Sequence, residues 1–244
     1  MNDFKEETLR IIIDKEKIVE KNLALEEAIL EILNEDKTQN TFRIWINEKS
    51  AIASIHEKID ETINIEFCFE KGIKINRRIT GGGTVYHDEG NINWSFFFRR
   101  NQKLNFDPVT LYEYFSSFII QAISTLGFEV RFNKPNWLGI YNRKISGMAG
   151  YLKRNALLIH GTLLVNANLV YLRKVCKLHY KYPEVINISD IKPISVQTVI
   201  EALTNTIQNN FKNSYVANDL EQNEKEMAAK LEENKYKKLD WIFK

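Results

Sequence analysis

The segment R-R-I-T-G-G-G-T-V-Y-H-D-E-G-N, residues 77–91, sets the expectations for the whole chain. Its three consecutive glycines carry no Cβ atoms, so backbone N–H groups can turn towards one point and a ligand can approach them closely. Arg77 and Arg78 stand just before the glycines, and the guanidinium group fits phosphate and carboxylate oxygens better than other side chains do. The segment therefore predicts an anion-binding loop that follows a strand.

Two further blocks share this concentration of glycine. Residues 142–150 read N-R-K-I-S-G-M-A-G and residues 159–166 read I-H-G-T-L-L-V-N, so that seven of the ten glycines fall in three short blocks. This clustering favours a ligand site over the alternative, in which the triple glycine is a flexible hairpin and the arginines are solvated. The glycine segment matches neither G-x-G-x-x-G nor G-x-x-x-x-G-K-[ST], the motifs of dinucleotide-binding and P-loop proteins.

The composition indicates a globular protein with a substantial core. The chain has 244 residues, of which 44% are hydrophobic, and its formal net charge is only +2. This small charge argues against a general nucleic-acid-coating or membrane-surface protein. Two cysteines make a disulfide framework unexpected and fit a reducing compartment. We see no signal peptide and no apolar segment long enough for a membrane span, and we expect a cytoplasmic protein.

Hydrophobic periodicity and turn residues predict a mixture of helices and short strands. We expect strands at residues 9–13, 42–46, 51–55, 73–75, 92–98, 128–132, 138–141, 144–151 and 156–165. We expect helices at residues 23–33, 108–126, 169–176, 195–211 and 220–233, with Asn22 as the cap of the first.

The order of these elements lacks the regular strand–helix alternation of a parallel sheet. We therefore predict the α+β class, with one domain built on a mostly antiparallel sheet flanked by helices. The strands on either side of the glycine segment should form a hairpin. The apolar residues 239–243 should dock on the domain or on another chain.

Five blocks together resemble the lipoate–protein ligase A family, which has the biotin/lipoate ligase fold. The resemblance covers most of the chain and implies that residues 1–244 form a single catalytic domain, without the C-terminal accessory domain of many bacterial members. The blocks are N-L-A-L-E-E at 22–27, I-W-I-N at 44–47, the glycine segment at 77–91, R-K-I-S-G-M-A at 143–149 and H-G-T-L-L-V-N at 160–166.

The resemblance implies a two-step reaction with ATP and Mg²⁺ as cofactors. Lipoate and ATP would form lipoyl-adenylate and pyrophosphate, and the lipoyl group would then pass to a lysine ε-amine. The implied partners are lipoyl-acceptor domains: the glycine-cleavage H protein, the acyltransferase subunit of a 2-oxoacid dehydrogenase, or another lipoate-binding protein. A separate accessory subunit is a further expected partner, whereas nucleic acid and membrane are not.

The resemblance also implies roles for individual residues. Lys144, in the R-K-x-S-G pattern, would touch both the acyl carbonyl and the phosphate of the adenylate, where a fixed ammonium stabilises developing charge. Arg78 would contact phosphate, whereas a structural role for Arg77 is equally open. The nucleotide would be bound by Gly83, Thr84, Val85 and Tyr86, although strand packing alone is the alternative for Val85 and Tyr86.

Three more side chains in these blocks are candidate ligands. His87 and His160 would lie beside the lipoyl group. The alternative for His87 is to orient the glycine loop, and for His160 it is to be a hydrogen-bonded core histidine. Asp88 is the candidate metal ligand, although an acid after a tight loop is often only a turn cap.

The chain departs from the family pattern at two kinds of position. Ser54 and Glu57 stand where the family commonly has glycine and glutamine near the acyl group, so the preference for lipoate is an open question. Transferring relatives use a cysteine nucleophile that forms a thioester, but Cys68 and Cys176 lie outside the matching motifs. The thioester route is therefore disfavoured, and a transferase acting from an activated donor without adenylating activity is the alternative to a ligase.

Overall fold

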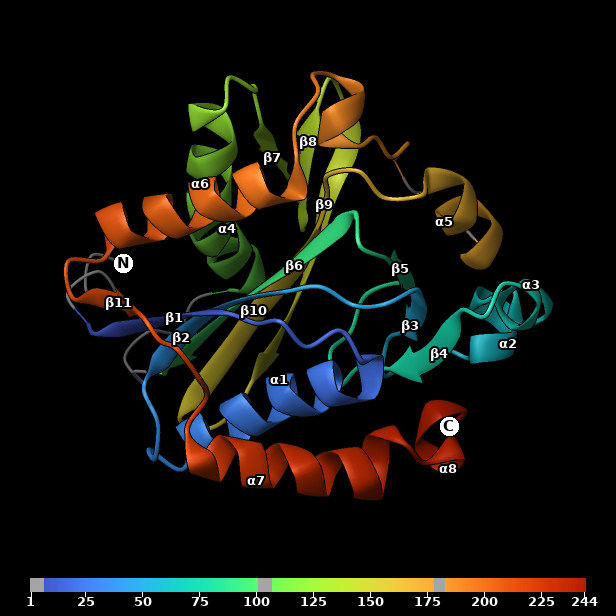
Figure 1. The fold of residues 1–244 in the computed structure, drawn as a ribbon, viewed down its shortest axis with the longest axis horizontal. Coiled ribbons are helices and arrows are strands. Elements are labelled where there is room, and N and C mark those ends of the chain that lie inside the picture. The colour runs from blue at the N-terminus through green and yellow to red at the C-terminus, as the bar shows by residue number, and fades with distance from the viewer. Residues whose placement is uncertain (1–6, 101–106, 178–182) are drawn as a thin grey trace.

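The computed structural model describes residues 7–100, 107–177 and 183–244, which form two sheets and the helices around them (Figure 1). In the larger, eight-stranded sheet, the first three strands are parallel and the remaining neighbours are antiparallel. Its order is β11 (Ser214–Val216), β1 (Leu9–Ile13), β2 (Asn40–Trp45), β6 (Asn91–Arg99), β10 (Ala156–Leu164), β9 (Arg143–Leu152), β8 (Trp137–Ile140) and β7 (Arg131–Asn133). This arrangement confirms the predicted α+β class.

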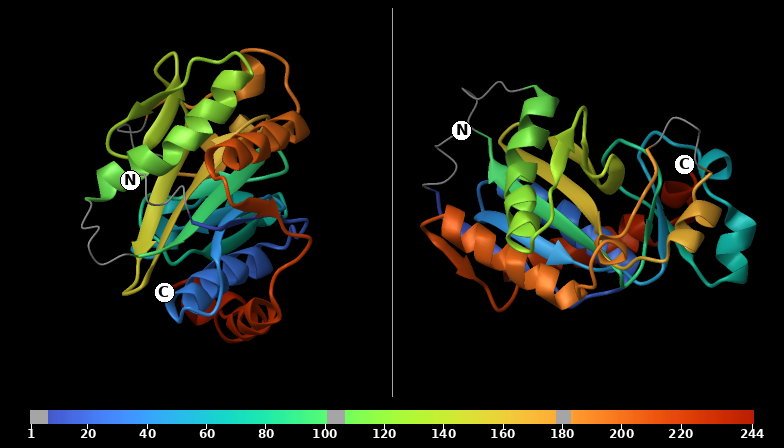
Figure 2. Two further views of the ribbon diagram at one scale, coloured as in Figure 1. Left: turned by 90° about the vertical axis from the view of Figure 1, so that its left-hand side faces the viewer. Right: turned by 90° about the horizontal axis from the view of Figure 1, so that it is seen from above.

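Helices cover both faces of the large sheet (Figures 1 and 2). Helices α4 (Pro108–Thr125) and α6 (Val196–Asn210) share one hydrophobic core with the sheet. Helix α1 (Val19–Asn34) packs on the opposite face, and α7 (Gln222–Leu231) lies against α1. The sheet therefore forms the middle layer of the domain.

Strand β6 divides its side chains between these two faces. Phe96 and Phe98 belong to the core beneath α4 and α6, whereas Phe97 packs with α1. Because side chains alternate along a strand, Asn93 and Ser95 share the face of Phe97. The hydroxyl of Ser95 indeed donates a hydrogen bond of 2.6 Å to a carboxylate on α1. Buried polar side chains thus lie between β6 and α1.

The second sheet has three strands, β4 (Lys74–Arg77), β3 (Ser50–Ala53) and β5 (Val85–His87), in that order. β3 is parallel to β4 and antiparallel to β5. Residues 78–84, which include the triple glycine, cross the end of β3 to connect its two neighbours. The predicted hairpin around the glycines is therefore wrong, because β3 takes the hydrogen bonds that hairpin partners would exchange, and β6 joins the larger sheet.

One local feature differs from the sequence expectations, and another was not predicted. Asn22 does not cap α1 but lies inside it, and its side-chain amide donates to Asn47. The run after Asn64 forms a short helix, which Asn64 caps by accepting from the N–H of Phe67. The remaining short elements are α2 (Ile59–Thr62), α3 (Ile65–Glu70), α5 (Leu169–Val175), η2 (Ile188–Asp190), η3 (Glu232–Tyr236) and α8 (Leu239–Ile242).

The predicted docking of residues 239–243 on the chain itself is found in part, because Leu239 and Phe243 are exposed. Ile242 of α8 is buried in the core around the small sheet, and Trp241 packs against it. Among the described residues, no helix combines the length and the apolar character that crossing a membrane requires.

Candidate functional site

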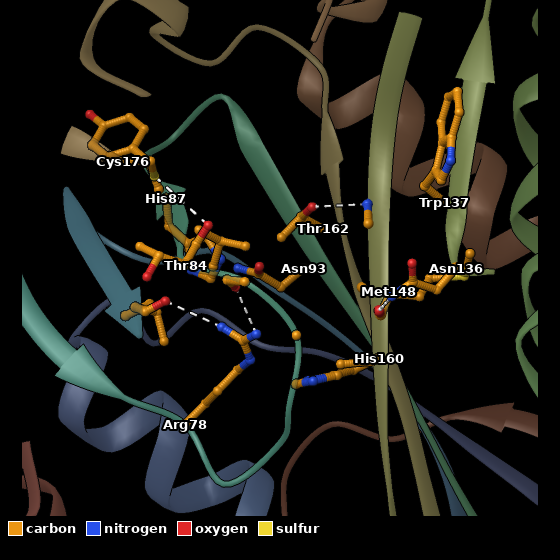
Figure 3. Close-up of a pocket in the computed structure, with 18 of the residues that line it drawn as sticks. Arg78, Thr84, His87, Asn93, Asn136, Trp137, Met148, His160, Thr162 and Cys176 are labelled. Atoms are coloured by element: carbon orange, nitrogen blue, oxygen red, sulfur yellow. Dashed lines mark hydrogen bonds between the residues drawn. The ribbon is translucent and has the colours of Figure 1, made fainter. Parts of the chain in front are cut away.

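A cavity of about 580 Å³ lies between the glycine loop and strands β6, β10 and β9 (Figure 3). Its size falls within the range of small-molecule sites. The predicted site residues that line it are Arg78, Gly83, Thr84, Val85, Tyr86, His87, Lys144 and His160. Blocks far apart in the sequence therefore meet at one place, and Asp88 is the predicted residue that does not line the cavity.

Arg78 holds the glycine loop in shape. Its Nη2 donates to the carbonyl oxygens of Gly81 and Gly83 at 2.6 and 2.9 Å, and its Nη1 donates to that of Ile52 at 3.2 Å. Between those carbonyls, Gly82 has a φ of +96°, which favours glycine. Burial lowers the pKa of Arg78 to about 10, so the guanidinium remains charged at neutral pH.

Lys144, on strand β9, is another of the cations that line the cavity. A Cβ atom added to Gly147 would come within 2.7 Å of the Lys144 Nζ, so the ammonium lies over the bare backbone of that glycine. Burial, together with the nearby charge of Arg78, lowers the pKa of Lys144. This close approach explains why the R-K-x-S-G pattern has a glycine at position 147.

Neither cation forms an ion pair with a carboxylate of the described residues. The acids whose charges act on Arg78 are Glu57 and Glu26. Glu57 accepts instead from Thr84 Oγ1 at 3.0 Å, and Glu26 accepts from Ser95 Oγ at 2.6 Å. The buried Arg78 and the half-buried Lys144, neither of them paired with an acid of the described residues, make the cavity electropositive, which suits an anionic ligand.

His160 supports the glycine loop from strand β10. Its Nε2 lies 2.8 Å from Thr80 Oγ1, and its Nδ1 lies 2.9 Å from Glu26 Oε1. Burial raises the pKa of Glu26, but His160, Ser95 and Arg43 together outweigh it and hold that pKa below its ordinary value. Since both ring nitrogens are bound, contact with an acyl ligand through the His160 ring stays a prediction.

His87 lies on β5 with one ring nitrogen bound and one without a partner. Its Nδ1 is 3.0 Å from Asn47 Nδ2, whereas no described residue pairs with its buried Nε2. Its ring meets Trp45 edge to face, with 6.1 Å between the ring centroids. Burial and the charge of Arg78 lower the pKa of His87 to about 3, so the ring is neutral at physiological pH.

Asp88 and Arg77 have the geometry of structural residues. The two oxygens of Asp88 accept from the backbone N–H groups of Gly90 at 2.9 Å and Asn168 at 2.8 Å. The side chain thus ties the turn after β5 to the start of α5, as a turn cap does. Within the described ranges, no group of three or more acidic, histidine or cysteine side chains is arranged for a metal ion. Arg77 donates to backbone carbonyls on both sides of the small sheet, including those of Ser54 and Ile242.

Several residues that line the cavity were not named as candidates by the sequence analysis. Glu26, Trp45, Asn93 and Met148 line the cavity together with apolar side chains. Asn93 left the clearest signal, because a polar residue inside a buried aromatic strand must face either a partner or a ligand. The others became visible only when the pairing of the strands was known.

Both cysteines are free and buried, but only Cys176 lines the cavity. Its Sγ lies 3.8 Å from the carbonyl oxygen of Thr84, and burial raises its pKa to about 12. Burial likewise raises the pKa of Cys68 to about 11. Because the thiolate is the nucleophilic form, neither environment favours thioester chemistry.

Comparison with known proteins gives concordant results. The model of the lipoyl protein ligase A/B catalytic domain matches residues 19–208. The chain is 35% identical over 146 residues to the lipoate-protein ligase LplJ of Bacillus subtilis, covering 60% of this chain and 42% of the relative. It spans about half the length of the curated relatives it matches.

Solved structures agree with the fold. One is a bi-partite lipoate protein ligase of Thermoplasma acidophilum, studied with its E2 lipoyl domain, which aligns with a TM-score of 0.84 at 24% identity over 98% of this chain and 96% of the other. Another is a lipoate-protein ligase A bound with ATP, with a TM-score of 0.86 at 24% identity over 98% of each chain. The fold of the described chain is therefore that of the biotin/lipoate ligases.

Proposed function

Because the chain belongs to the lipoyl protein ligase A/B catalytic domain family, we propose that it is an ATP-dependent lipoate–protein ligase. The observation that carries this proposal is that the buried Arg78 and the half-buried Lys144 meet at one cavity and form no ion pair with a carboxylate of the described residues. Such a cavity can take an anionic acyl acid together with a phosphate, and its walls include apolar side chains that suit an alkyl chain.

The first step would activate the acid. A carboxylate oxygen of lipoate attacks the α-phosphorus of ATP, an acyl–phosphate bond forms, and pyrophosphate leaves. Negative charge accumulates on the phosphoryl oxygens during this attack, and a fixed ammonium beside them stabilises the transition state. We assign this role to Lys144, and the room that the bare backbone of Gly147 leaves for its Nζ supports the assignment.

The glycine loop would hold the nucleotide. Arg78 keeps the loop carbonyls turned towards its guanidinium, which leaves the opposite side of the loop for a ligand. We assign the nucleotide to residues 83–86, and the phosphate to Lys144 and the electropositive field of Arg78. Since Nε of Arg78 donates to Thr80 Oγ1 and its Nη1 and Nη2 donate to carbonyl oxygens, its contribution to phosphate binding is mainly electrostatic.

The second step would transfer the acyl group to a protein. The lysine amine of the acceptor attacks the acyl carbon, AMP leaves, and the nitrogen loses a proton. We propose a lipoyl domain as acceptor, in line with the bi-partite Thermoplasma acidophilum ligase and its E2 lipoyl domain. The glycine-cleavage H protein and other lipoate-binding proteins are further acceptors of the same chemistry. The bi-partite relative also supports a separate accessory subunit as partner.

Magnesium would enter as the counter-ion of ATP, bound by phosphate oxygens as is usual for this ion. Asp88 fits a magnesium ligand poorly, because both of its oxygens already accept backbone hydrogen bonds and it does not line the cavity. The two free, buried cysteines are consistent with a cytoplasmic enzyme.

The test is lipoate-dependent release of pyrophosphate from ATP and Mg²⁺, with and without an accessory polypeptide. Lys144→Met, which keeps the length of the side chain without its charge, should abolish release. The matched control is Lys153→Met, a lysine that pairs with Glu31 at the end of the same strand. Normal release by Lys144→Met would contradict its role. Transfer from synthetic lipoyl-adenylate without any release would instead indicate a transferase.

A further inference from the structure

A chain of buried hydrogen bonds runs from Arg43 to His87. Arg43, which can only donate, binds Asn22 Oδ1. Asn22 Nδ2 must then face acceptors, and it lies 2.8 Å from the carbonyl oxygen of Glu16 and 3.0 Å from Asn47 Oδ1. With its oxygen engaged in this way, Asn47 turns its Nδ2 to His87 Nδ1 at 3.0 Å. Each member of the chain therefore fixes the orientation of the next.

This chain determines the tautomer of His87. The Nδ1 atom accepts a hydrogen from Asn47, so the proton of the neutral imidazole is on Nε2. That Nε2–H group is buried and has no acceptor among the described residues. A buried donor without a partner costs free energy, and a ligand that supplies an acceptor recovers it.

Asn93 presents a second donor of the same kind. Its Oδ1 accepts from Asn91 Nδ2 at 3.1 Å, while its own buried Nδ2 has no partner among the described residues. Asn93 and His87 both line the cavity (Figure 3). Asn93 is also the register partner of Trp45, whose ring meets that of His87. His87 and Asn93 are thus both neighbours of Trp45, the first through its ring and the second through strand pairing.

We propose that His87 Nε2–H and Asn93 Nδ2 bind an oxygen of the carboxyl group of the acyl substrate. This inference rests on the proposed function and adds to it a second polar anchor, distinct from Lys144. The donors are carried by β5 and β6, whereas Lys144 projects from β9 on the other side of β10. The two donors would accordingly hold the carboxyl group from one wall of the cavity, while Lys144 contacts the phosphate from another.

The chemistry of the two donors favours a carboxyl group over a polyphosphate. Both donors are uncharged and cannot neutralise the several charges of ATP, for which Lys144 and Arg78 are better suited. A carboxylate bears one charge over two oxygens and becomes a neutral carbonyl once activated, so neutral donors can hold it before and after that step. The adjoining Trp45 ring offers an apolar wall for the first methylenes of the chain.

Substitution of Asn47 tests the proposal without altering the cavity wall. Asn47→Asp is isosteric but replaces the donor facing Nδ1 by an acceptor, which draws the proton to Nδ1 and leaves a lone pair at Nε2. The expected result is a loss of about 5- to 150-fold in lipoic acid affinity by calorimetry, as for one lost buried hydrogen-bond partner, with ATP affinity unchanged. The matched control is Asn34→Asp, whose Oδ1 already acts as an acceptor for Asn155 N.

The tautomer itself is measured in the unmodified protein by ¹⁵N NMR of the histidine rings. His87 should show a protonated Nε2 and an unprotonated Nδ1, and the Nε2 signal should shift when lipoic acid is added. A proton on Nδ1 would overturn the proposal, whether or not the Asn47 variant folds. Asn93→Leu, which removes the second donor, should also weaken the binding of lipoic acid.

The outcomes separate this inference from the proposed function. If the protein releases pyrophosphate normally but lipoic acid affinity is unchanged in Asn47→Asp and Asn93→Leu, the anchor is wrong and the ligase assignment stands. If those variants lose ATP affinity instead, the donors serve the nucleotide and the carboxyl assignment is overturned. If the unmodified protein neither binds lipoic acid nor releases pyrophosphate, with or without an accessory chain, both fail together.

Discussion

Arg77 and Trp241 bind each other reciprocally. The Nε of Arg77 donates to the carbonyl oxygen of Trp241, the indole Nε1 of Trp241 donates to the carbonyl oxygen of Arg77, and both distances are 3.2 Å. The same guanidinium donates through Nη1 to the carbonyl oxygens of Ser54 and Glu57 at 2.6 and 2.7 Å. One buried side chain therefore joins α8, β4 and the loop that follows β3.

Removing this guanidinium should destabilise the protein more than it changes the cavity. We expect Arg77→Ala to lower the free energy of unfolding by about 2–4 kcal/mol, because several buried carbonyls lose their donors. Urea denaturation measures this change, and Arg154→Ala, an exposed arginine at the β9–β10 turn, is the control. Wild-type stability in Arg77→Ala would mean that the backbone around α8 is held by other contacts.

Gly147→Ala should lower the activity of the protein with little effect on its stability. The added Cβ would lie 2.7 Å from the Lys144 Nζ, so the ammonium must move away from the position in which we place it during adenylation. We expect pyrophosphate release to fall on the order of 100-fold, while the thermal midpoint changes little because the obstacle is the end of a flexible side chain. Activity of Gly147→Ala equal to that of the unmodified protein would argue against a fixed position of Lys144.

His87 should make the protein sensitive to acid. Its pKa is lowered from 6.5 to about 3, so the unfolded chain binds a proton in this interval while the folded chain does not. The stabilising contribution is therefore complete above pH 6.5 and is lost as the pH falls towards 3, with a slope of up to about 1.4 kcal/mol per pH unit. Denaturation between pH 7 and 4 should show a shallower slope in His87→Gln than in wild type. Substitution of the exposed His56 by Gln should leave the slope unchanged; a wild-type slope in His87→Gln would contradict the assignment.

Cys176 should resist alkylation although it lines the cavity. Burial raises its pKa to about 12, so almost no thiolate exists at pH 8 in the folded protein. We expect iodoacetamide to modify Cys176 slowly in the native state and rapidly in urea, as followed by mass spectrometry of its peptide. Rapid native modification would reopen the thioester route.

Local sequence predicted much of the fold but not the partners of its strands. The strand 9–13 and the helix beginning at Pro108 were predicted closely, because hydrophobic periodicity and a proline at the first turn are local signals. The hairpin prediction failed because nothing between residues 73 and 98 reveals that β3 lies between β4 and β5. Pairing across the sheet is a tertiary property, which a single sequence without a turn signal does not specify.

The candidate site, like the fold, was predicted from the sequence only in part. The three glycine-containing blocks identified Arg78 and Lys144, and the structure places both at one cavity. The hydrogen-bond chain that orients His87 was invisible, since Asn22 and Asn47 resemble ordinary cap and turn residues in the sequence. Their roles depend on α1, β2 and β5 meeting in space.

The passage of residues 78–84 over the end of β3 limits how this region can change in length. The tip of an ordinary hairpin accepts extra residues, because an insertion there disturbs only the turn. Here residues 78–84 connect β4 to β5, which pair with opposite edges of β3, so an insertion would have to fit within this connection. It would also break the hydrogen bonds that Arg78 donates to the carbonyl oxygens of Gly81 and Gly83. We therefore expect libraries of loop-length variants to yield folded protein readily at the turn of residues 153–155 and rarely within residues 78–84.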